Sequence, residues 1–291
     1  MTPRLHHPVA ETGGKDAAAA AAAAAAVAGA AARGYAPDFV ESVLDDALHH
    51  GSRIHAIGGL QGTGKSTLAA QLVALARQGG LRAVALSIDD FYLGRRERLH
   101  LGRTVHPLLA TRGPPGTHDV ALACETLDAL RDGRPTRLPR FDKIADRRLP
   151  QSRWPMIGEV DLVVFEGWFL KTPPQAPEAL REPVNALERE EDAEGIWRTY
   201  CNASLARDYP RLWSRLDRLL WLHGPGFEVV PGWRWQQEES LQALHPTRQT
   251  MSRAQVERFV QYFERVSRQA WRHLPSIADV TRRVDARRHP L

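Results

Sequence analysis

Residues 57–67 read IGGLQGTGKST, and this stretch constrains the chain more than any other. It has the spacing Gly59-x-x-x-x-Gly64-Lys65-Ser66, which is the P-loop pattern. Glycines let the backbone turn its N–H groups toward phosphate oxygens, and the N-terminus of a following helix adds positive charge. The pattern predicts that a nucleoside triphosphate is bound by Gly59, Gly62, Thr63, Gly64, Lys65, Ser66 and Thr67.

The residues on either side of this loop support the prediction. Residues 53–57 are typical of a short strand, and residues 66–78 are typical of an amphipathic helix that ends at a Gly-Gly pair. Strand, loop and helix therefore follow in the order that the motif requires. In that arrangement Lys65 would reach the β- and γ-phosphates of ATP, and the Ser66 hydroxyl would bind Mg²⁺.

The composition is that of a globular protein able to bury a sizeable core. The chain has 291 residues, of which 43% are hydrophobic and 25% charged. Its net charge of +5 is spread along the chain among 34 acidic residues, without a basic block. We therefore expect no nucleic-acid partner, and the basic character fits an enzyme that acts on anionic small molecules.

Residues 17–26 are all alanine. Alanine is barely apolar and acidic residues precede the run, so we expect residues 1–35 to be a low-complexity extension, disordered or a frayed helix. No other segment approaches the length of a membrane span. With Cys124 and Cys201 far apart and expected to be reduced thiols, the sequence favours a cytoplasmic protein without a membrane partner.

Apolar runs alternate with amphipathic segments along the rest of the chain. The alternation predicts an α/β fold, a three-layer sandwich in which a mainly parallel five-stranded sheet has helices on both faces. Residues 94–118, rich in Arg, His, Gly and Pro, are expected to be irregular, and residues 136–150 suggest a hairpin or extended arm. Strands are expected at 53–57, 82–93, 161–170, 218–224 and 278–285, and helices at 36–51, 66–78, 118–133, 186–207, 233–244 and 252–274.

Acidic residues follow two of the expected strands. Asp89 and Asp90 come after VALSI, and Glu166 comes after DLVVF. Ligands of open parallel sheets bind beyond the carboxyl ends of the strands, so these acids should share a site with the P-loop. We expect Glu166 to hold Mg²⁺ directly or through water. Because neighbours on an extended segment point to opposite sides, only one of the two aspartates should face the γ-phosphate.

Several motifs resemble those of a known family. The segment SIDDFYL (87–93) resembles the second motif of the small-molecule P-loop kinases, which include uridine kinase, phosphoribulokinase and bacterial pantothenate kinase. The similarity narrows to the D-glycerate 3-kinase branch and covers about residues 53–285. The motifs that carry it are RGPPGTHD (112–119), RFDK (140–143), FEGW (165–168), WRWQQE (233–238) and MSRAQVERFVQYF (251–263).

This resemblance implies a kinase that uses ATP and Mg²⁺, with D-glycerate as the first candidate acceptor. It implies a single domain over residues 36–291, with an acceptor-side insertion at about 94–155 and a helical lid at about 225–245. The first aspartate of the motif would be the catalytic base. The implied roles are catalysis by Asp89, Lys65 and Arg234, metal binding by Ser66, Glu166 and Asp89, and acceptor binding by Asp90, Tyr92, His118, Lys143 and Arg147.

One segment departs from the family pattern. Plant-type glycerate kinases carry YDKS followed by GRGDR where this chain has FDKIADRR (141–148), so Phe141 replaces a tyrosine. Two other functions therefore stay open. The chain resembles uridine and pantothenate kinases of the same superfamily, and a P-loop protein that hydrolyses ATP without an acceptor would carry the same loop. The sequence leaves the oligomeric state open.

Overall fold

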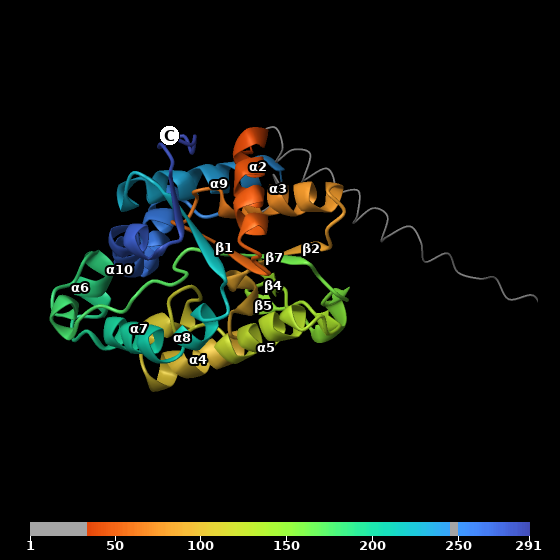
Figure 1. Ribbon diagram of the computed structural model, residues 1–291. Coiled ribbons are helices and arrows are strands. Elements are labelled where there is room, and N and C mark those ends of the chain that lie inside the picture. The colour runs from red at the N-terminus through yellow and green to blue at the C-terminus, as the bar shows by residue number, and fades with distance from the viewer. Residues whose placement is uncertain (1–33, 245–249) are drawn as a thin grey trace, which may run out of the picture.

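The computed structural model describes residues 34–244 and 250–291 (Figure 1). At its centre is a five-stranded sheet in which every neighbouring pair of strands is parallel. The predicted strands and the predicted parallel sheet are confirmed. The strands lie in the order β2 (Ala83–Ser87), β7 (Leu162–Gly167), β1 (Ile54–Gly59), β8 (Arg218–His223) and β9 (Val280–Arg283).

Helices cover both faces of the sheet, as predicted (Figure 1). Successive side chains of a strand point to opposite faces, so β7 contributes to two cores. Val163 and Phe165 pack with residues of α5 (Val120–Arg131), α8 (Pro210–Trp213) and α10 (Arg253–Ile277). Leu162 and Val164 pack with α2 (Pro37–His49) and α3 (Lys65–Gln78). Both faces are apolar, which explains the continuous hydrophobic strand sequences.

Four further α-helices are present in the described residues. They are α4 (Arg95–Thr104), α6 (Ala186–Glu191), α7 (Ile196–Arg207) and α9 (Val230–Leu244). The long helix α10 begins with a capping box, in which Ser252 and Gln255 each accept a hydrogen bond from the other's backbone N–H.

The prediction that residues 94–118 are irregular was wrong, because α4 and a 3₁₀ helix (Pro107–Ala110) lie there. The Gly94 N–H donates to Glu97 Oε2 at the start of α4, 2.6 Å away. The inward face of α4 carries Arg98, whose side chain is only 1% exposed and donates to the Leu93 and Ala110 carbonyls. Because an arginine fills a position usually held by an apolar residue, hydrophobic periodicity does not reveal this helix.

Residues 136–157 form two small antiparallel pairs. Strand β3 (Thr136–Arg137) pairs with β6 (Met156–Ile157), and β4 (Phe141–Asp142) pairs with β5 (Arg147–Arg148). The β4–β5 hairpin is attached to the main body by Arg148, which donates to the Tyr92 carbonyl and to Asp119. The hairpin predicted within this segment is therefore present, and it is fixed against the segment that follows β2.

The alanine run at residues 17–26 lies outside the described residues. Within the described ranges, no helix combines the length and apolar character needed to cross a membrane.

Candidate active site

The P-loop connects the end of β1 to the start of α3. Gly62 and Gly64 have φ angles of +84° and +94°, which side-chain-bearing residues adopt only with strain. A Cβ atom at Gly62 would also lie 2.5 Å from Trp233. Tyr35 supports the loop from the other side, since its hydroxyl donates to the Thr63 carbonyl at 2.6 Å. The loop therefore needs glycine both for its turns and for close packing.

Lys65 is the first residue of α3, and its side chain is buried at the base of the loop. Its Nζ donates to the Leu60 carbonyl at 2.9 Å. Burial lowers the pKa of the Lys65 ammonium, while the charges of Glu166 and Asp89 act to raise it. Because its hydrogen bond is to a neutral carbonyl, the Lys65 ammonium can attract a bound anion, in competition with the charges of Glu166 and Asp89.

Ser66 and Glu166 meet across the end of the sheet. The Ser66 hydroxyl donates to Glu166 Oε1 at 2.9 Å. Glu166 lies on β7 between its register partners Ile57 of β1 and Ser87 of β2, so three neighbouring strands fix its position. A hydroxyl and a carboxylate oxygen beside the P-loop are hard oxygen donors, and this donor set fits Mg²⁺.

Asp89 and Asp90 lie in a 3₁₀ turn (Ile88–Phe91), so the expectation of an extended segment was wrong. Their side chains nevertheless have different environments. Asp89 accepts hydrogen bonds from the Tyr92 hydroxyl and from Lys143 Nζ, each at 2.7 Å. Asp90 Oδ2 accepts from the Ser87 backbone N–H at 3.1 Å and from Arg140 Nη1 at 3.2 Å. Asp90 thus caps the turn that presents Asp89.

The two aspartates also differ in pKa. Burial acts to raise the pKa of Asp89, but the charge of Lys143 and the hydrogen bonds from Lys143 and Tyr92 outweigh it and lower the pKa to about 2. Burial dominates at Asp90 and raises its pKa, against the opposing charge of Arg140. Asp89 is therefore the more firmly ionised of the two carboxylates.

The P-loop, Glu166 and Asp89 border one cavity of about 780 Å³, hereafter the central cavity. A volume of this order suits a nucleotide-sized ligand. The structure thus brings P-loop residues together with predicted catalytic, metal-binding and acceptor residues. Those that line the central cavity are Gly62, Lys65, Ser66, Asp89, Tyr92, Lys143, Glu166 and Arg234.

Three predicted acceptor residues, Asp90, His118 and Arg147, do not line the central cavity. His118 lies behind Tyr92, with the two ring centres 4.7 Å apart, and its Nδ1 lies 2.7 Å from the Tyr209 hydroxyl. Burial lowers the pKa of His118 to about 4, so the ring is neutral at pH 7. Arg147 is exposed on β5 and is absent from the cavity lining. His118 is placed to support Tyr92, and Arg147 faces solvent.

Arg112 lines the central cavity and was not predicted as a site residue. Its Nη2 donates to the Lys143 carbonyl at 3.0 Å, and it also pairs with Asp146. Its guanidinium carbon lies 5.5 Å from the centre of the Phe141 ring. The sequence did mark this segment, because Arg112 begins the motif RGPPGTHD. The motif alone, however, does not show which of its residues lines the cavity.

Arg234 borders the central cavity from α9. It forms an ion pair with Glu238, one helical turn further along, and its guanidinium carbon lies 6.0 Å from the centre of the Phe259 ring. Trp168 is 3% exposed and contacts Phe169 and Phe263, and it forms part of the cavity wall.

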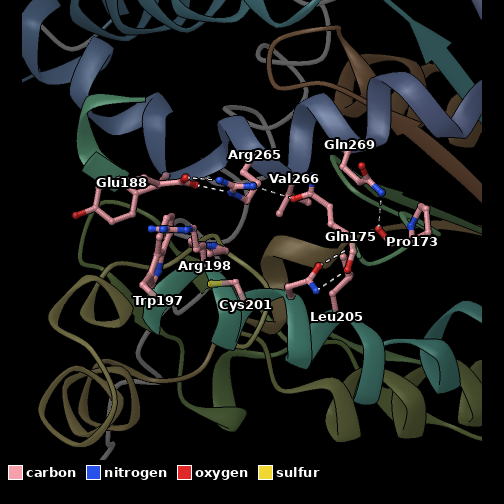
Figure 2. Close-up of a pocket in the computed structure, with 13 residues that line it drawn as sticks. Pro173, Gln175, Glu188, Trp197, Arg198, Cys201, Leu205, Arg265, Val266 and Gln269 are labelled. Carbon is pink, nitrogen blue, oxygen red and sulfur yellow. Dashed lines mark hydrogen bonds and ion pairs between the residues drawn. The ribbon is translucent and has the colours of Figure 1, made fainter. Parts of the chain in front are cut away.

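A second, much smaller cavity of about 20 Å³ lies among α6, α7, α10 and the segment around Gln175 (Figure 2). Its buried charges are paired. Arg265 contacts Glu188 at 2.6 Å, and Arg198 contacts Asp192 at 3.0 Å. This volume holds a single water molecule, so the cavity cannot take a nucleotide.

Known proteins resemble the chain in sequence and in structure, although no protein-family model matches it. The uncharacterized kinase mug58 of Schizosaccharomyces pombe is 33% identical over 224 residues, which are 72% of this chain and 78% of that protein. The chloroplastic D-glycerate 3-kinase of Arabidopsis thaliana is 35% identical over 140 residues, 44% of this chain and 30% of the plant protein. The solved D-glycerate 3-kinase of Cryptococcus neoformans has a TM-score of 0.68 and 25% identity, with 87% of this chain and 95% of that chain covered.

The sequence relatives and the structural match agree with the motifs. Both place the chain among kinases, and the solved structure shares its fold over 87% of this chain. The predicted P-loop kinase fold is therefore confirmed. The chain belongs to the D-glycerate 3-kinase-like branch of the P-loop small-molecule kinases and is an ATP-dependent kinase.

Proposed function

We propose that this kinase transfers the γ-phosphate of ATP to a hydroxyl group of a small anionic hydroxy acid, with D-glycerate as the first candidate. One observation carries the proposal. The central cavity joins a phosphate-binding end, with Lys65 and Ser66, to an end where a carboxylate and two cations lie together, Asp89, Lys143 and Arg112.

At the phosphate end, residues 59–67 hold the triphosphate through backbone N–H groups, and Lys65 holds the β- and γ-phosphates. Mg²⁺ would be held by Ser66 and Glu166, and when bound it neutralises charge on the phosphates. Asp89, the third expected metal ligand, already binds Lys143 and Tyr92, and we assign it to the acceptor.

At the acceptor end, Asp89 takes the proton of the acceptor hydroxyl as that oxygen bonds to the γ-phosphorus and the bond to ADP breaks. While Lys143 holds Asp89, the carboxylate is a weak base. The acceptor's own carboxylate would compete for Lys143 and for Arg112, and so free Asp89 for the hydroxyl. Asp90 and Tyr92 hold the turn and orient Asp89, and His118 supports Tyr92.

Arg234 supplies charge from the lid side of the cavity. Phosphoryl transfer is accelerated mainly by positioning and by neutralising charge on the transferred group, and an arginine suits this role. In this proposal, residues 225–245 act as the lid, residues 94–155 form the acceptor side, and residues 36–291 make one kinase domain with a cytoplasmic location. The outward position of Arg147 removes it from the proposed acceptor contacts.

The test is an acceptor screen with purified protein, ATP and Mg²⁺, in which ADP release and phosphorylated product are measured. D-glycerate is compared with glycerol, which keeps hydroxyls but lacks the carboxylate, and with pantothenate, uridine and no acceptor. We expect the highest kcat/KM with D-glycerate. Preference for uridine or pantothenate would assign the chain to those activities, and ADP release that is independent of every acceptor would indicate an ATPase.

A further inference from the structure

Arg288 lies outside the central cavity but connects two elements that border it. Its Nε donates to the Gly62 carbonyl in the P-loop at 2.5 Å, and its Nη2 donates to Gln236 Oε1 on α9 at 2.9 Å. The guanidinium carbon also lies 5.2 Å from the centre of the Trp233 ring. A single planar side chain therefore joins the P-loop to the first turns of α9.

These two elements already touch at the same point. Gly62 packs so closely on Trp233 that there is no space for a Cβ atom. Arg234, which lines the central cavity, directly follows Trp233 in α9. A change in the contact between Gly62 and Trp233 would therefore move Arg234 relative to the P-loop, and Arg288 spans this contact from outside the cavity.

The backbone around Arg288 is arranged to hold this side chain in place. Arg288 has a φ angle of +71°, in the left-handed region that residues other than glycine rarely adopt. Asp285 fixes the turn, because its side chain accepts from the backbone N–H groups of Arg287 and His289, each at 2.8 Å. The Ala286 carbonyl accepts from Trp233 Nε1 at 2.8 Å. Such conformations persist where the surroundings hold them and are concentrated at functional sites.

The contacts of Arg288 do not neutralise its positive charge. Its hydrogen-bond acceptors are a carbonyl and an amide oxygen, and its ring partner is an indole. Burial lowers the pKa of Arg288, yet a guanidinium stays protonated in proteins. The positive charge beside Gly62 is therefore not cancelled by these contacts, and it adds to the field that attracts phosphates.

We propose that Arg288 is a positioning residue that holds the P-loop and α9 in the arrangement that binds ATP and presents Arg234 to its phosphates. The inference rests on the proposed assignment of residues 59–67 as the phosphate site. Arg288 acts through the Gly62 carbonyl and through Trp233 and Gln236, without touching the substrate.

The experiment measures ATP affinity by calorimetric titration without an acceptor, and kcat by ADP release with the acceptor that the screen identifies. Arg288→Ala should weaken ATP binding about tenfold, the size of one lost charge-assisted hydrogen bond, and lower kcat. Arg288→Lys should recover part of both. Gln236→Ala should lower kcat but leave ATP affinity near wild type, since the Gly62 contact remains. Arg287→Ala, at an exposed neighbour, is the matched control and should change neither.

Lys65→Ala and thermal melting without nucleotide distinguish the outcomes. Unchanged ATP affinity and kcat in Arg288→Ala, with binding lost in Lys65→Ala, would overturn the role of Arg288 alone. Unchanged affinity in both variants would instead overturn the proposed phosphate site. A large drop in melting temperature in Arg288→Ala, with normal ATP affinity of the folded protein, would reduce Arg288 to a structural residue and overturn the inference.

Discussion

Lys143 and Asp89 form an ion pair across the acceptor end of the central cavity, with Lys143 Nζ 2.7 Å from Asp89 Oδ2. The two residues come from different parts of the fold. Lys143 lies in the turn of the β4–β5 hairpin, and Asp89 lies in the 3₁₀ turn after β2. The pair therefore ties the position of the hairpin to the charge of the proposed catalytic base.

The pair has a consequence for acceptor choice. A neutral acceptor leaves Lys143 on Asp89, where the carboxylate has a pKa of about 2 and is a weak base. An anionic acceptor offers Lys143 a second carboxylate and weakens its hold on Asp89. In the proposed reaction, one lysine would thus both select for a charged acceptor and activate the base.

Lys143→Met tests this coupling. The variant keeps a long side chain and loses the charge, so kcat/KM for D-glycerate should fall by about 10- to 100-fold, as for a lost charge-assisted hydrogen bond. The rate with glycerol should rise, because Asp89 is freed from Lys143 and becomes a stronger base, so the preference for the anionic acceptor should shrink. The preference is the ratio of kcat/KM for D-glycerate to kcat/KM for glycerol, measured by steady-state kinetics. Arg147→Met, on the exposed side of the same hairpin, is the control. A preserved preference in Lys143→Met would rule out the proposed exchange.

The variants Asp89→Asn and Asp90→Asn distinguish the proposed catalytic role of Asp89 from the structural role of Asp90. Removal of a general base typically costs about 10²–10⁴ in rate, so Asp89→Asn should lower kcat by that factor with ATP affinity nearly unchanged. Asp90→Asn should mainly lower the melting temperature, because Asp90 caps the Ser87 turn and pairs with Arg140. Kinetics and thermal melting are measured on both variants. A larger kcat loss in Asp90→Asn than in Asp89→Asn would reverse the two roles.

Much of the fold could be predicted because its signals are local. Apart from β9 (VTRR), the strands are short and mainly apolar, and the P-loop marks the first strand–helix unit by its spacing alone. Parallel strands bring their carboxyl ends to one edge, so the sequence could also predict that Glu166 and Asp89 lie near the P-loop. The hydrogen bond of 2.9 Å between Ser66 and Glu166 shows that the P-loop helix and β7 meet at this edge.

The parts that could not be predicted depend on contacts between distant residues. Arg147 and Arg148 are neighbours on β5, yet Arg147 is exposed while Arg148 contacts Asp119. A shift of one residue in the register of a hairpin exchanges such positions, and nothing in FDKIADRR fixes that register. Arg112 reaches the central cavity, and Arg288 contacts the P-loop from outside it, both from segments without a periodic sequence pattern, so only the folded chain shows their contacts.

Lys65→Ala should abolish most ATP binding while leaving the fold intact. Lys65 sits at the base of the P-loop with its ammonium on the Leu60 carbonyl, and the loss of its contact with phosphate should weaken ATP binding by about 10- to 100-fold. Calorimetric titration with ATP measures this, with the exposed Arg96→Ala as a control for loss of one positive charge. ATP affinity equal to wild type in Lys65→Ala would refute the phosphate site.

Stability should fall as the pH drops from about 6.5 to about 4, because two histidines are buried in neutral form. Burial lowers the pKa values of His55 and His118 to about 4, from an ordinary value of 6.5. Between these values the unfolded chain binds protons that the folded chain does not, so each histidine favours unfolding as the pH falls. Each contributes up to about 1.4 kcal/mol of unfolding free energy per pH unit in this window.

The His118→Gln variant isolates one of these contributions. Glutamine does not titrate and can keep a hydrogen bond to the Tyr209 hydroxyl, which lies 2.7 Å from His118 Nδ1. The free energy of unfolding is measured with urea at pH 7, 6, 5 and 4.5 for both proteins. With falling pH it should decrease less steeply in the variant than in the wild type, by the slope that corresponds to the binding of about one proton. The window lies above the range in which Asp89, with its pKa of about 2, becomes protonated, so the ion pair with Lys143 does not contribute to the difference. Identical slopes for the two proteins would mean that His118 binds its proton equally well in the folded and unfolded chains, and the neutral support for Tyr92 would have to be abandoned.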